Sequence, residues 1–305
     1  MELHQLRYFV AAAEAGSITR AADRCRVSQP TLSQQLQRLE ASLGHSLFDR
    51  LGRGVALTPA GAALLPRARR ILAEADDARE HLAGEVERGV GTLRLGAIPT
   101  IAPYVLPSVI ARLRRRFPSA GVEVREDLTE ALVERLASGE LDAAIVSTPI
   151  DHHGVRLRVL GSEPMLVVAP AASDVGEEGG LTLADLRERP RVALHEMHCL
   201  GQQISGFCSA KNLGASVACS TAQLATLLEF VRLGLGVSIV PEMAAVADRS
   251  RERRYTRFKR GGPRREIALA TPAGRTPPAT LEAVALFASD RLREMQAAAS
   301  ARFGG

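Results

Sequence analysis

The spacing of apolar residues predicts three short helices at the start of the chain. Apolar side chains recur at helical intervals over residues 3–13, and Gly16 ends this first helix. Ser17 is placed to cap a second helix over residues 18–25. After a two-residue turn, Ser28 is placed to cap a third helix. Two helices joined by a tight turn predict a helix-turn-helix.

The third predicted helix has a leucine face and a polar face. Its leucines, which are expected to be buried, are Leu32, Leu36, Leu39 and Leu43. The opposite side carries amides, hydroxyls and one guanidinium, which can bond to base edges and phosphates in a major groove. The candidate DNA-contacting residues of this helix and its cap are Ser28, Gln29, Pro30, Thr31, Ser33, Gln34 and Arg38. The alternative is a solvated helical face in an all-α bundle.

A short hairpin is predicted directly after these helices. Two runs with strand character, 46–50 and 55–57, flank Gly52-Arg53-Gly54. Such a hairpin with a basic tip is typical of the wing of a winged helix, and Arg50 and Arg53 would then contact phosphates or the minor groove. The sequence therefore predicts a winged helix-turn-helix domain over residues 1–58.

The next segment predicts a linker helix, residues 59–89, that Thr58 caps. A heptad-like apolar seam, broken by Arg79, is formed by Leu65, Ala68, Leu72, Ala75 and Leu82. The seam favours pairing with a second copy of the helix, although it could also pack on its own domain.

From Gly91 the pattern changes to alternating strands and helices. The predicted strands are 92–98, 122–126, 141–147, 165–169, 192–194, 217–219, 237–240 and 267–270, and the main predicted helices cover 102–117, a segment starting near Thr129, and the residues after Pro278. This order predicts a two-lobed α/β domain over residues 90–305, with lobe I at 90–161 and 266–305 and lobe II at 162–265. Ligands of such folds bind between lobes, where Thr100 and Thr129 are expected either to contact a ligand or to cap helices.

Composition adds three expectations. The 305 residues carry a net charge of +5, nearly all of the positive charge from arginine, which permits a polyanionic partner. The longest apolar runs are too short to span a bilayer and no leader sequence is evident, so we expect a cytoplasmic protein. In that reducing compartment none of the four cysteines, Cys25, Cys199, Cys208 and Cys219, is expected to form a permanent disulfide.

The amino-terminal sequence resembles one known family over more than sixty residues. The stretch LRYFVAAAEAGSITRAADRCRVSQPTLSQQLQRLEASLGHSLFDRLGRGVALTPAGAALLPRARRIL is similar to the DNA-binding domain of LysR-type transcriptional regulators. This resemblance implies a recognition helix in the major groove of double-stranded operator DNA, a dimerising linker helix, dimers paired into tetramers, and contact with RNA polymerase. It also implies an effector domain similar to periplasmic solute-binding proteins.

A second resemblance lies in HEMHCLGQQISGFC, residues 195–208. It is similar to the OxyR subfamily of LysR-type regulators, which are activators that respond to hydrogen peroxide. The resemblance implies a reversible disulfide between Cys199 and Cys208, and its reduction by thioredoxin or glutaredoxin. The residues that it implies in peroxide binding or thiolate support are Thr100, Thr129, His198 and Arg265. It implies no cofactor and no enzymatic turnover.

The residues themselves add a physical argument. Cys199 follows a predicted strand and precedes a predicted helix, where backbone N–H groups favour a thiolate. Cys208 is the candidate resolving thiol. If the intervening residues were helical, the two Cα atoms would lie roughly 13 Å apart, whereas a disulfide needs them within about 7 Å. The local fold must then open before the bond can close.

Several alternatives remain. Cys199 and Cys208 could be unreactive thiols in a regulator of a small organic effector, or the cysteine chemistry could belong to a thiol peroxidase. A metal site is not favoured, because no Cys-x-x-Cys spacing occurs. Cys25 is expected in a helical core, and Cys219 is either an inert core residue or a competing disulfide partner. The arginines of residues 249–260 are expected to form a solvated basic surface.

Overall fold

The computed structural model of the protein describes residues 1–305 except 52–53, 83–90, 176–180, 214–215, 275–276 and 305. For residues 50–51 and 76–82 only the backbone is described. The chain divides into two compact units, residues 1–86 with 134–141 and residues 87–133 with 142–305, so that α6 (Thr129–Ala137) is shared between them. The domain boundaries expected at residues 58 and 89 stay predictions.

Three helices form the start of the first unit, as predicted. They are α1 (Leu3–Ala15), α2 (Ile18–Cys25) and α3 (Gln29–Leu43). Gly16, with a φ of 59°, ends α1. The Ser17 hydroxyl accepts the N–H of Arg20 at 3.4 Å, and the Ser28 hydroxyl accepts the N–H of Thr31 at 3.3 Å. Both caps were predicted because a cap depends on residues only three positions apart.

The leucine face of α3 packs into a core shared by all three helices. Its buried members are Leu6, Phe9, Ala12, Ala21, Ala22, Leu32, Leu36, Leu39, Leu47 and Ala68. Cys25 packs against this core and is half-buried, as expected. The predicted wing is present as β1 (Phe48–Leu51) paired antiparallel with β2 (Gly54–Leu57). The side chain of Arg50 and all of Arg53 lie outside the described residues.

Helix α4 (Pro59–Leu82) begins at the predicted cap, where the Thr58 hydroxyl accepts the N–H of Gly61 at 3.0 Å. The first half of its apolar seam is used within its own unit, because Leu65, Ala68 and Leu72 pack against the winged-helix core. Ala75 is half-buried, and the side chains of Arg79 and Leu82 lie outside the described residues. The pairing of α4 with a second copy of the helix stays a prediction.

The second unit is built on a curved sheet of seven strands. In lobe I the elements are β3 (Gly91–Ala97), α5 (Ala102–Arg116), β4 (Ala120–Glu126), α6 (Thr129–Ala137) and β5 (Ala143–Ser147). The elements that follow are β6 (Val155–Pro170), a 3-10 turn (Ala184–Leu186), β7 (Arg191–Leu194), α7 (Cys199–Ala210), β8 (Val217–Thr221), α8 (Leu224–Arg232), β9 (Ser238–Pro241), α9 (Glu242–Ala247), β10 (Arg253–Thr256), β11 (Arg264–Pro272) and α10 (Ala279–Phe303). The sheet order is β10-β6-β11-β5-β3-β4, with β9 also paired to β6, and β7 pairs parallel with β8.

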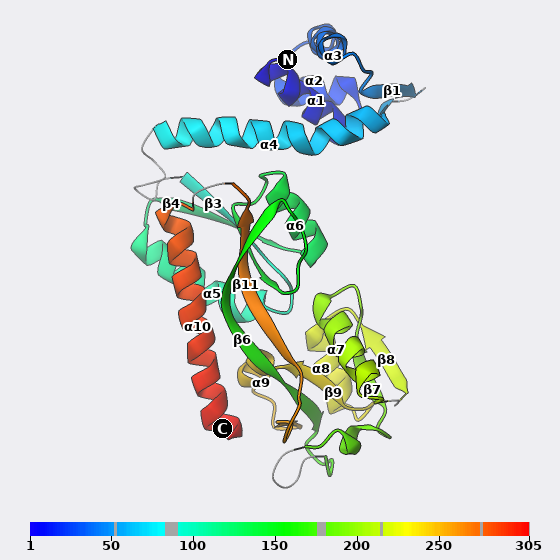
Figure 1. Cartoon of the computed structure of the whole chain (residues 1–305), viewed down its shortest axis with the longest axis vertical. Coiled ribbons are helices and arrows are strands. Elements are labelled where there is room, and N and C mark those ends of the chain that lie inside the picture. The colour runs from blue at the N-terminus through cyan, green and yellow to red at the C-terminus, as the bar shows by residue number, and fades with distance from the viewer. Residues whose placement is uncertain (52–53, 83–90, 176–180, 214–215, 275–276, 305) are drawn as a thin grey trace. The chain divides into compact units, whose positions relative to one another are not determined.

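Two long strands connect the lobes. β6 and β11 run antiparallel from Val155 opposite Pro272 to Pro164 opposite Arg264. Figure 1 shows the pair passing from the β3–β5 region to the α7–β9 region. The two-lobed α/β architecture is therefore confirmed, although the sequence predicted only the parts of β6 and β11 that are rich in β-branched and apolar residues.

The segment of residues 249–260 differs from its prediction. β10 was not predicted, and Arg253 is not solvated, because its side chain is only 8% exposed. Its guanidinium contacts the carboxylates of Asp248, at 2.7 Å, and Glu229, at 2.8 Å. Arg257 likewise pairs with the buried carboxylate of Glu242. The expectation of a solvated basic surface was wrong for these two arginines because each meets an acid on another part of lobe II.

Candidate functional site

The first half of α3 presents a polar face to solvent. Six of the seven predicted residues are exposed, and Ser33 is half-buried; the exposed ones are Ser28, Gln29, Pro30, Thr31, Gln34 and Arg38. One neighbouring amide is not available, since the side-chain oxygen of Gln35 accepts from Gln5 at 3.1 Å. Exposed amides and a guanidinium on a helix that is fixed by its leucines can read base edges. The identity of the DNA-contacting residues stays a prediction.

The base of the wing is fixed by a residue that sequence reasoning missed. The carboxylate of Glu40, in α3, accepts the backbone N–H groups of Leu47 at 2.7 Å and Phe48 at 3.3 Å. The N–H of Val55, in β2, donates to the carbonyl of Gly16 at 3.1 Å. These bonds fix the wing relative to the recognition helix, which defines a winged helix-turn-helix.

Cys199 lies at the first position of α7, as predicted. It is half-buried, and the preceding residue, His198, has an extended backbone. No side chain caps this end of the helix. Helix termini leave their first N–H groups without intrahelical partners, and together with the helix dipole these favour a negative charge. The position is therefore suited to a reactive cysteine.

The ring of His198 serves another contact. It is only 7% exposed, and its Nε2 lies 2.6 Å from the carbonyl oxygen of Ala222. A carbonyl only accepts, so Nε2 must carry the proton, which leaves Nδ1 as an acceptor in the neutral ring. This bond fixes the ring orientation beside Cys199 and determines its tautomer.

Arg265 and Thr100 are brought together, although they are 165 residues apart in sequence. The guanidinium is fully buried and donates to the Thr100 hydroxyl at 2.8 Å and to the Thr100 carbonyl at 3.0 Å. Its Nε donates to the buried carboxylate of Glu163 at 2.7 Å. The guanidinium of Arg265 therefore bonds to these two residues and to the sulfur of Met243, rather than to Cys199.

Neither candidate threonine caps a helix. The N-cap of α5 is Ile101, and the Thr100 hydroxyl accepts from Arg265 instead. Thr129 is the first residue of α6, and its hydroxyl is buried with no hydrogen-bond partner. A buried unpaired hydroxyl is costly, and the Thr129 hydroxyl has bonding capacity that its own helix does not use. The prediction that they are ordinary caps is wrong.

Cys208 is the opposite of Cys199 in its surroundings. It is 2% exposed and packs in the lobe II core. Burial raises the pKa of its thiol, although the adjacent Arg191 guanidinium, which bonds to the sulfur, acts to lower it. Cys208 is therefore held as an unreactive thiol while α7 remains docked.

Both cysteines lie on the single helix α7, so the conditional geometric argument applies. Nine helical residues advance the chain by about 13 Å and turn it by roughly two and a half turns, which places the side chains on opposite faces. A disulfide needs Cα atoms within about 7 Å. The helix must therefore unwind before these two sulfurs can bond.

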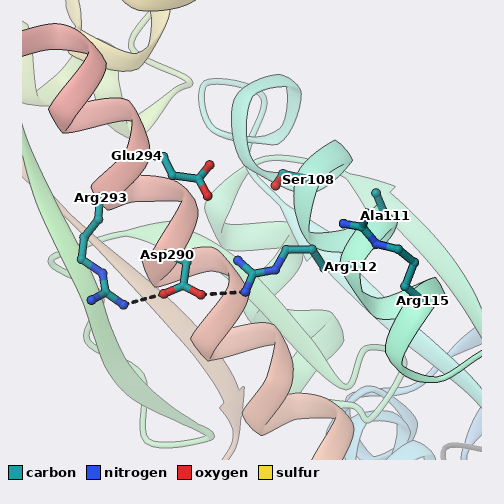
Figure 2. Close-up of a pocket in the computed structure, with 7 residues that line it drawn as sticks. All are labelled: Ser108, Ala111, Arg112, Arg115, Asp290, Arg293 and Glu294. Atoms are coloured by element: carbon teal, nitrogen blue, oxygen red, sulfur yellow. Dashed lines mark hydrogen bonds and ion pairs between the residues drawn. The ribbon is translucent and has the colours of Figure 1, made fainter. Parts of the chain in front are cut away.

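Four further observations concern the other described residues. The groove between α5 and α10 is charge-paired, because Asp290 bonds to both Arg112 and Arg293 (Figure 2). No group of three metal-binding side chains occurs in the described part of the chain. None of the described helices is long and apolar enough to cross a membrane. Cys219, in β8, is half-buried against the lobe II core, and its role stays open.

Comparison with known proteins identifies the class. A model described as "Bacterial regulatory helix-turn-helix protein, lysR family" matches residues 3–62, and one described as "LysR substrate binding domain" matches residues 87–293. The chain belongs to the LysR family of bacterial transcriptional regulators.

Two curated relatives are similar to this chain over most of its length. The chain is 36% identical to a probable hydrogen peroxide-inducible genes activator of Streptomyces viridosporus, over 96% of this chain and 95% of that protein. It is 34% identical to the DNA-binding transcriptional dual regulator OxyR of Escherichia coli K12, over 90% of each chain.

Two solved structures are also similar to this chain over most of its length. A full-length OxyR variant from Pseudomonas aeruginosa aligns with a TM-score of 0.79 at 31% identity, covering 94% of each chain. A serine mutant of Corynebacterium glutamicum OxyR with bound H2O2 aligns with a TM-score of 0.67 at 30% identity, covering 99% of this chain and 95% of that one.

Proposed function

We propose that this LysR-family regulator senses hydrogen peroxide through a reversible disulfide between Cys199 and Cys208, and that the disulfide changes its binding to operator DNA. The observation that carries the proposal is the arrangement on α7, with Cys199 at the uncapped start of the helix and Cys208 buried on its far side. The names of the relatives, hydrogen peroxide-inducible genes activators, support it.

The chemistry has two steps. The Cys199 thiolate attacks one peroxide oxygen; an S–O bond forms, the O–O bond breaks, and the hydroxide that leaves takes a proton to become water. The Cys208 thiol then loses its proton and attacks the Cys199 sulfur; an S–S bond forms, the S–O bond breaks, and the hydroxide that leaves takes up a proton to become a second water. Two thiols and one peroxide thus give a disulfide and two waters.

The buried polar residues around lobe I would position the peroxide. The Thr129 hydroxyl has unused bonding capacity, and the Nδ1 of His198 would accept a hydrogen bond from a bound molecule. Arg265 holds Thr100 by donating to its hydroxyl oxygen and to its carbonyl oxygen. Because the hydroxyl acts as the acceptor in this contact, its hydrogen would be available to a ligand. We assign all four residues to peroxide binding or thiolate support.

The switch would act mechanically. Unwinding α7 withdraws Leu200 and Cys208 from the lobe II core, where both are buried. Refolding of this segment would change the surface of the effector domain, the assembly of dimers and tetramers, and the spacing of the DNA-binding heads. RNA polymerase would contact the activated form on promoter DNA, and thioredoxin or glutaredoxin would reduce the disulfide in a reducing cytoplasm.

The test is mass mapping of all four cysteines after one equivalent of hydrogen peroxide. It uses the wild type, Cys199→Ser, Cys208→Ser and, as a matched control, Cys25→Ser. We expect a Cys199–Cys208 disulfide in the wild type and in Cys25→Ser, a sulfenic acid on Cys199 in Cys208→Ser, and no oxidation in Cys199→Ser. Reduced thiols throughout, or a dominant disulfide to Cys219, would refute the proposed pair.

A further inference from the structure

The contacts that hold α7 in its docked position determine how readily a Cys199–Cys208 disulfide closes, because closure requires the helix to leave that position. This dependence rests on the proposed function. Two α7 side chains make hydrogen bonds within lobe II: the Gln202 amide donates to the Glu196 carbonyl at 2.9 Å, and Cys208 bonds to Arg191.

Gln203 is different, because its side chain crosses to lobe I. Its Nε2 donates to the carbonyl of Thr148 at 2.7 Å and to the hydroxyl of Ser147 at 3.2 Å. Ser147 is the last residue of β5, a strand whose five residues are all buried, so the acceptors are fixed. Among the α7 side chains, all of which the structure describes, Gln203 alone is hydrogen-bonded to a described residue of lobe I.

Gln203 follows Cys199 by four residues, so the two side chains lie on the same face of α7. Its side-chain oxygen is buried and has no hydrogen-bond partner. In the docked helix the Gln203 Nε2 donates two hydrogen bonds, whereas the Gln203 Oε1 loses its hydrogen bonds to water. When α7 is released, water can reach that oxygen, which favours release. The contact is thus strong enough to position the helix and weak enough to break.

Helix α7 is intrinsically weak apart from this contact. It has no side-chain cap at its amino end, and it contains Gly201 and Gly206 among twelve residues. A cavity of 430 Å³ lies between the helix and the β7–β8 pair, lined in part by Ile204 and Ser205. Packing atoms are missing on that side, so the helix gains less from docking.

The frame around α7 is held more firmly. Helix α10 contacts lobe I through α5, where Asp290 bonds to Arg112 (Figure 2). The Arg112 guanidinium also lies over the ring of Phe287, 4.1 Å from its centroid. At its other end, Arg302 donates to the carbonyls of Ala245 and Asp248 at the end of α9 in lobe II. Because α10 is bonded to both lobes, it resists movement of one lobe against the other. We therefore expect oxidation to move α7.

We propose that Gln203 is a positioning residue that holds α7 against lobe I and thereby sets the rate at which oxidised Cys199 closes onto Cys208. Cys199 would react with peroxide while Gln203 is bonded to Thr148. Closure would then follow the loss of that bond. Gln203 acts through the position of the helix and takes no part in the S–O or S–S chemistry.

The test separates the two chemical steps in the full-length protein. Sulfenic acid formation is followed in the Cys208→Ser background by trapping with a cyclic 1,3-dione, and closure is followed by mass mapping of quenched samples after one equivalent of peroxide. The variants are Gln203→Ala and Gln203→Glu, which keeps the shape but removes the donor. Gln202→Ala is the control, because the neighbouring amide bonds only within lobe II. Circular dichroism confirms that each variant is folded.

We expect both Gln203 variants to close about tenfold faster than the wild type, which is the effect of losing hydrogen bonds of ordinary strength, with sulfenic acid formation unchanged. Gln202→Ala should behave as the wild type. Unchanged or slower closure in the Gln203 variants overturns the inference, as does slower sulfenic acid formation, which would place Gln203 in peroxide binding instead. If the wild type forms no disulfide, the proposed function fails, and this inference fails with it.

Discussion

Arg265 donates two hydrogen bonds to Thr100, one to its hydroxyl at 2.8 Å and one to its carbonyl at 3.0 Å, from a guanidinium that is fully buried. The charge is balanced by Glu163, whose second oxygen accepts the N–H of Met243 at 2.9 Å. One side chain thus joins lobe I, the crossing strands β6 and β11, and α9 of lobe II. We therefore expect the geometry of the proposed peroxide site to depend on this contact.

Replacing Arg265 should therefore cost both stability and reactivity. Arg265→Gln leaves the Glu163 carboxylate buried without its cation, which typically destabilises by about 3 kcal/mol. The Thr100 hydroxyl also loses its fixed orientation, so sulfenic acid formation on Cys199 should slow. Urea unfolding and dione trapping measure the two effects. The double variant Glu163→Gln/Arg265→Gln should recover part of the stability but not the reactivity; recovery of both would contradict a role for Arg265 in positioning Thr100.

Acid should weaken lobe II through Asp248. Burial alone would raise the pKa of this carboxyl, but bonds from Arg253 and Tyr255 lower it from 3.8 to about 2. A group whose pKa is depressed on folding stabilises the fold above its unfolded pKa and loses that contribution as the pH falls through its folded pKa. The contribution, about 2 kcal/mol, should be complete above about pH 4 and lost towards pH 2.

Asp248→Asn tests this pH dependence. Its unfolding free energy should be lower than that of the wild type at pH 7, and the difference should shrink between about pH 4 and 2. Glu282→Gln, at an exposed ion pair with Arg158, is the control and should change stability little, because water and salt screen such pairs. A difference for Asp248→Asn that stays constant down to pH 2 would show that this carboxylate does not titrate as the structure predicts.

The two glycines of α7 should respond oppositely to alanine. A Cβ on Gly201 would meet the carbonyl oxygen of Leu194 at 2.7 Å and that of His195 even closer, so the first turn cannot dock unchanged. Gly206 has nothing within 4 Å. Gly201→Ala should lower stability by about 1–3 kcal/mol, and Gly206→Ala should raise it by about 0.5–1 kcal/mol.

Hydrogen exchange of the α7 amides in the reduced protein measures this difference locally. Gly201→Ala should increase exchange over residues 199–210, whereas Gly206→Ala should slow it. Equal exchange in the two variants would mean that the amino end of α7 is not closely packed on the β7 loop.

Arg38 should matter for DNA and not for redox chemistry. It is exposed on α3, and Arg38→Ala should weaken operator binding by about 1–3 kcal/mol if it contacts a base, or reduce the salt dependence if it contacts a phosphate. Fluorescence anisotropy at several salt concentrations distinguishes the two. The matched control is Arg114→Ala, an exposed arginine of α5 in the other unit, which should leave binding unchanged. Unchanged binding by Arg38→Ala would remove it from the interface.

The parts of the fold that were predicted from sequence depend on near neighbours. Ser17, Ser28 and Thr58 cap helices through bonds to residues three positions on, and the leucines of α3 follow helical spacing. The first half of β6 was missed because Arg156 and Arg158 interrupt its apolar pattern. These arginines are exposed where β6 pairs with β11, and a single sequence does not reveal that pairing.

The candidate site was predicted only in part for the same reason. Cys199, Cys208 and His198 lie in one contiguous segment, so their placement on or beside α7 followed from local pattern. Glu163 is 102 residues from Arg265, and Gln203 is 55 residues from Thr148. Both contacts form only when distant parts of the chain fold together. A single sequence shows Glu163 and Gln203 as polar residues and does not reveal the partners of their side chains.

The central claim is that peroxide, acting through Cys199, changes how this regulator engages DNA. Its most direct test is a footprint on an operator selected from random DNA by the reduced protein, taken before and after one equivalent of peroxide with the wild type and Cys199→Ser. We predict that the protected region of the wild type changes in length or spacing and returns on reduction, while that of Cys199→Ser stays constant. A footprint that is identical before and after oxidation in the wild type, with the Cys199–Cys208 disulfide formed, would contradict the account.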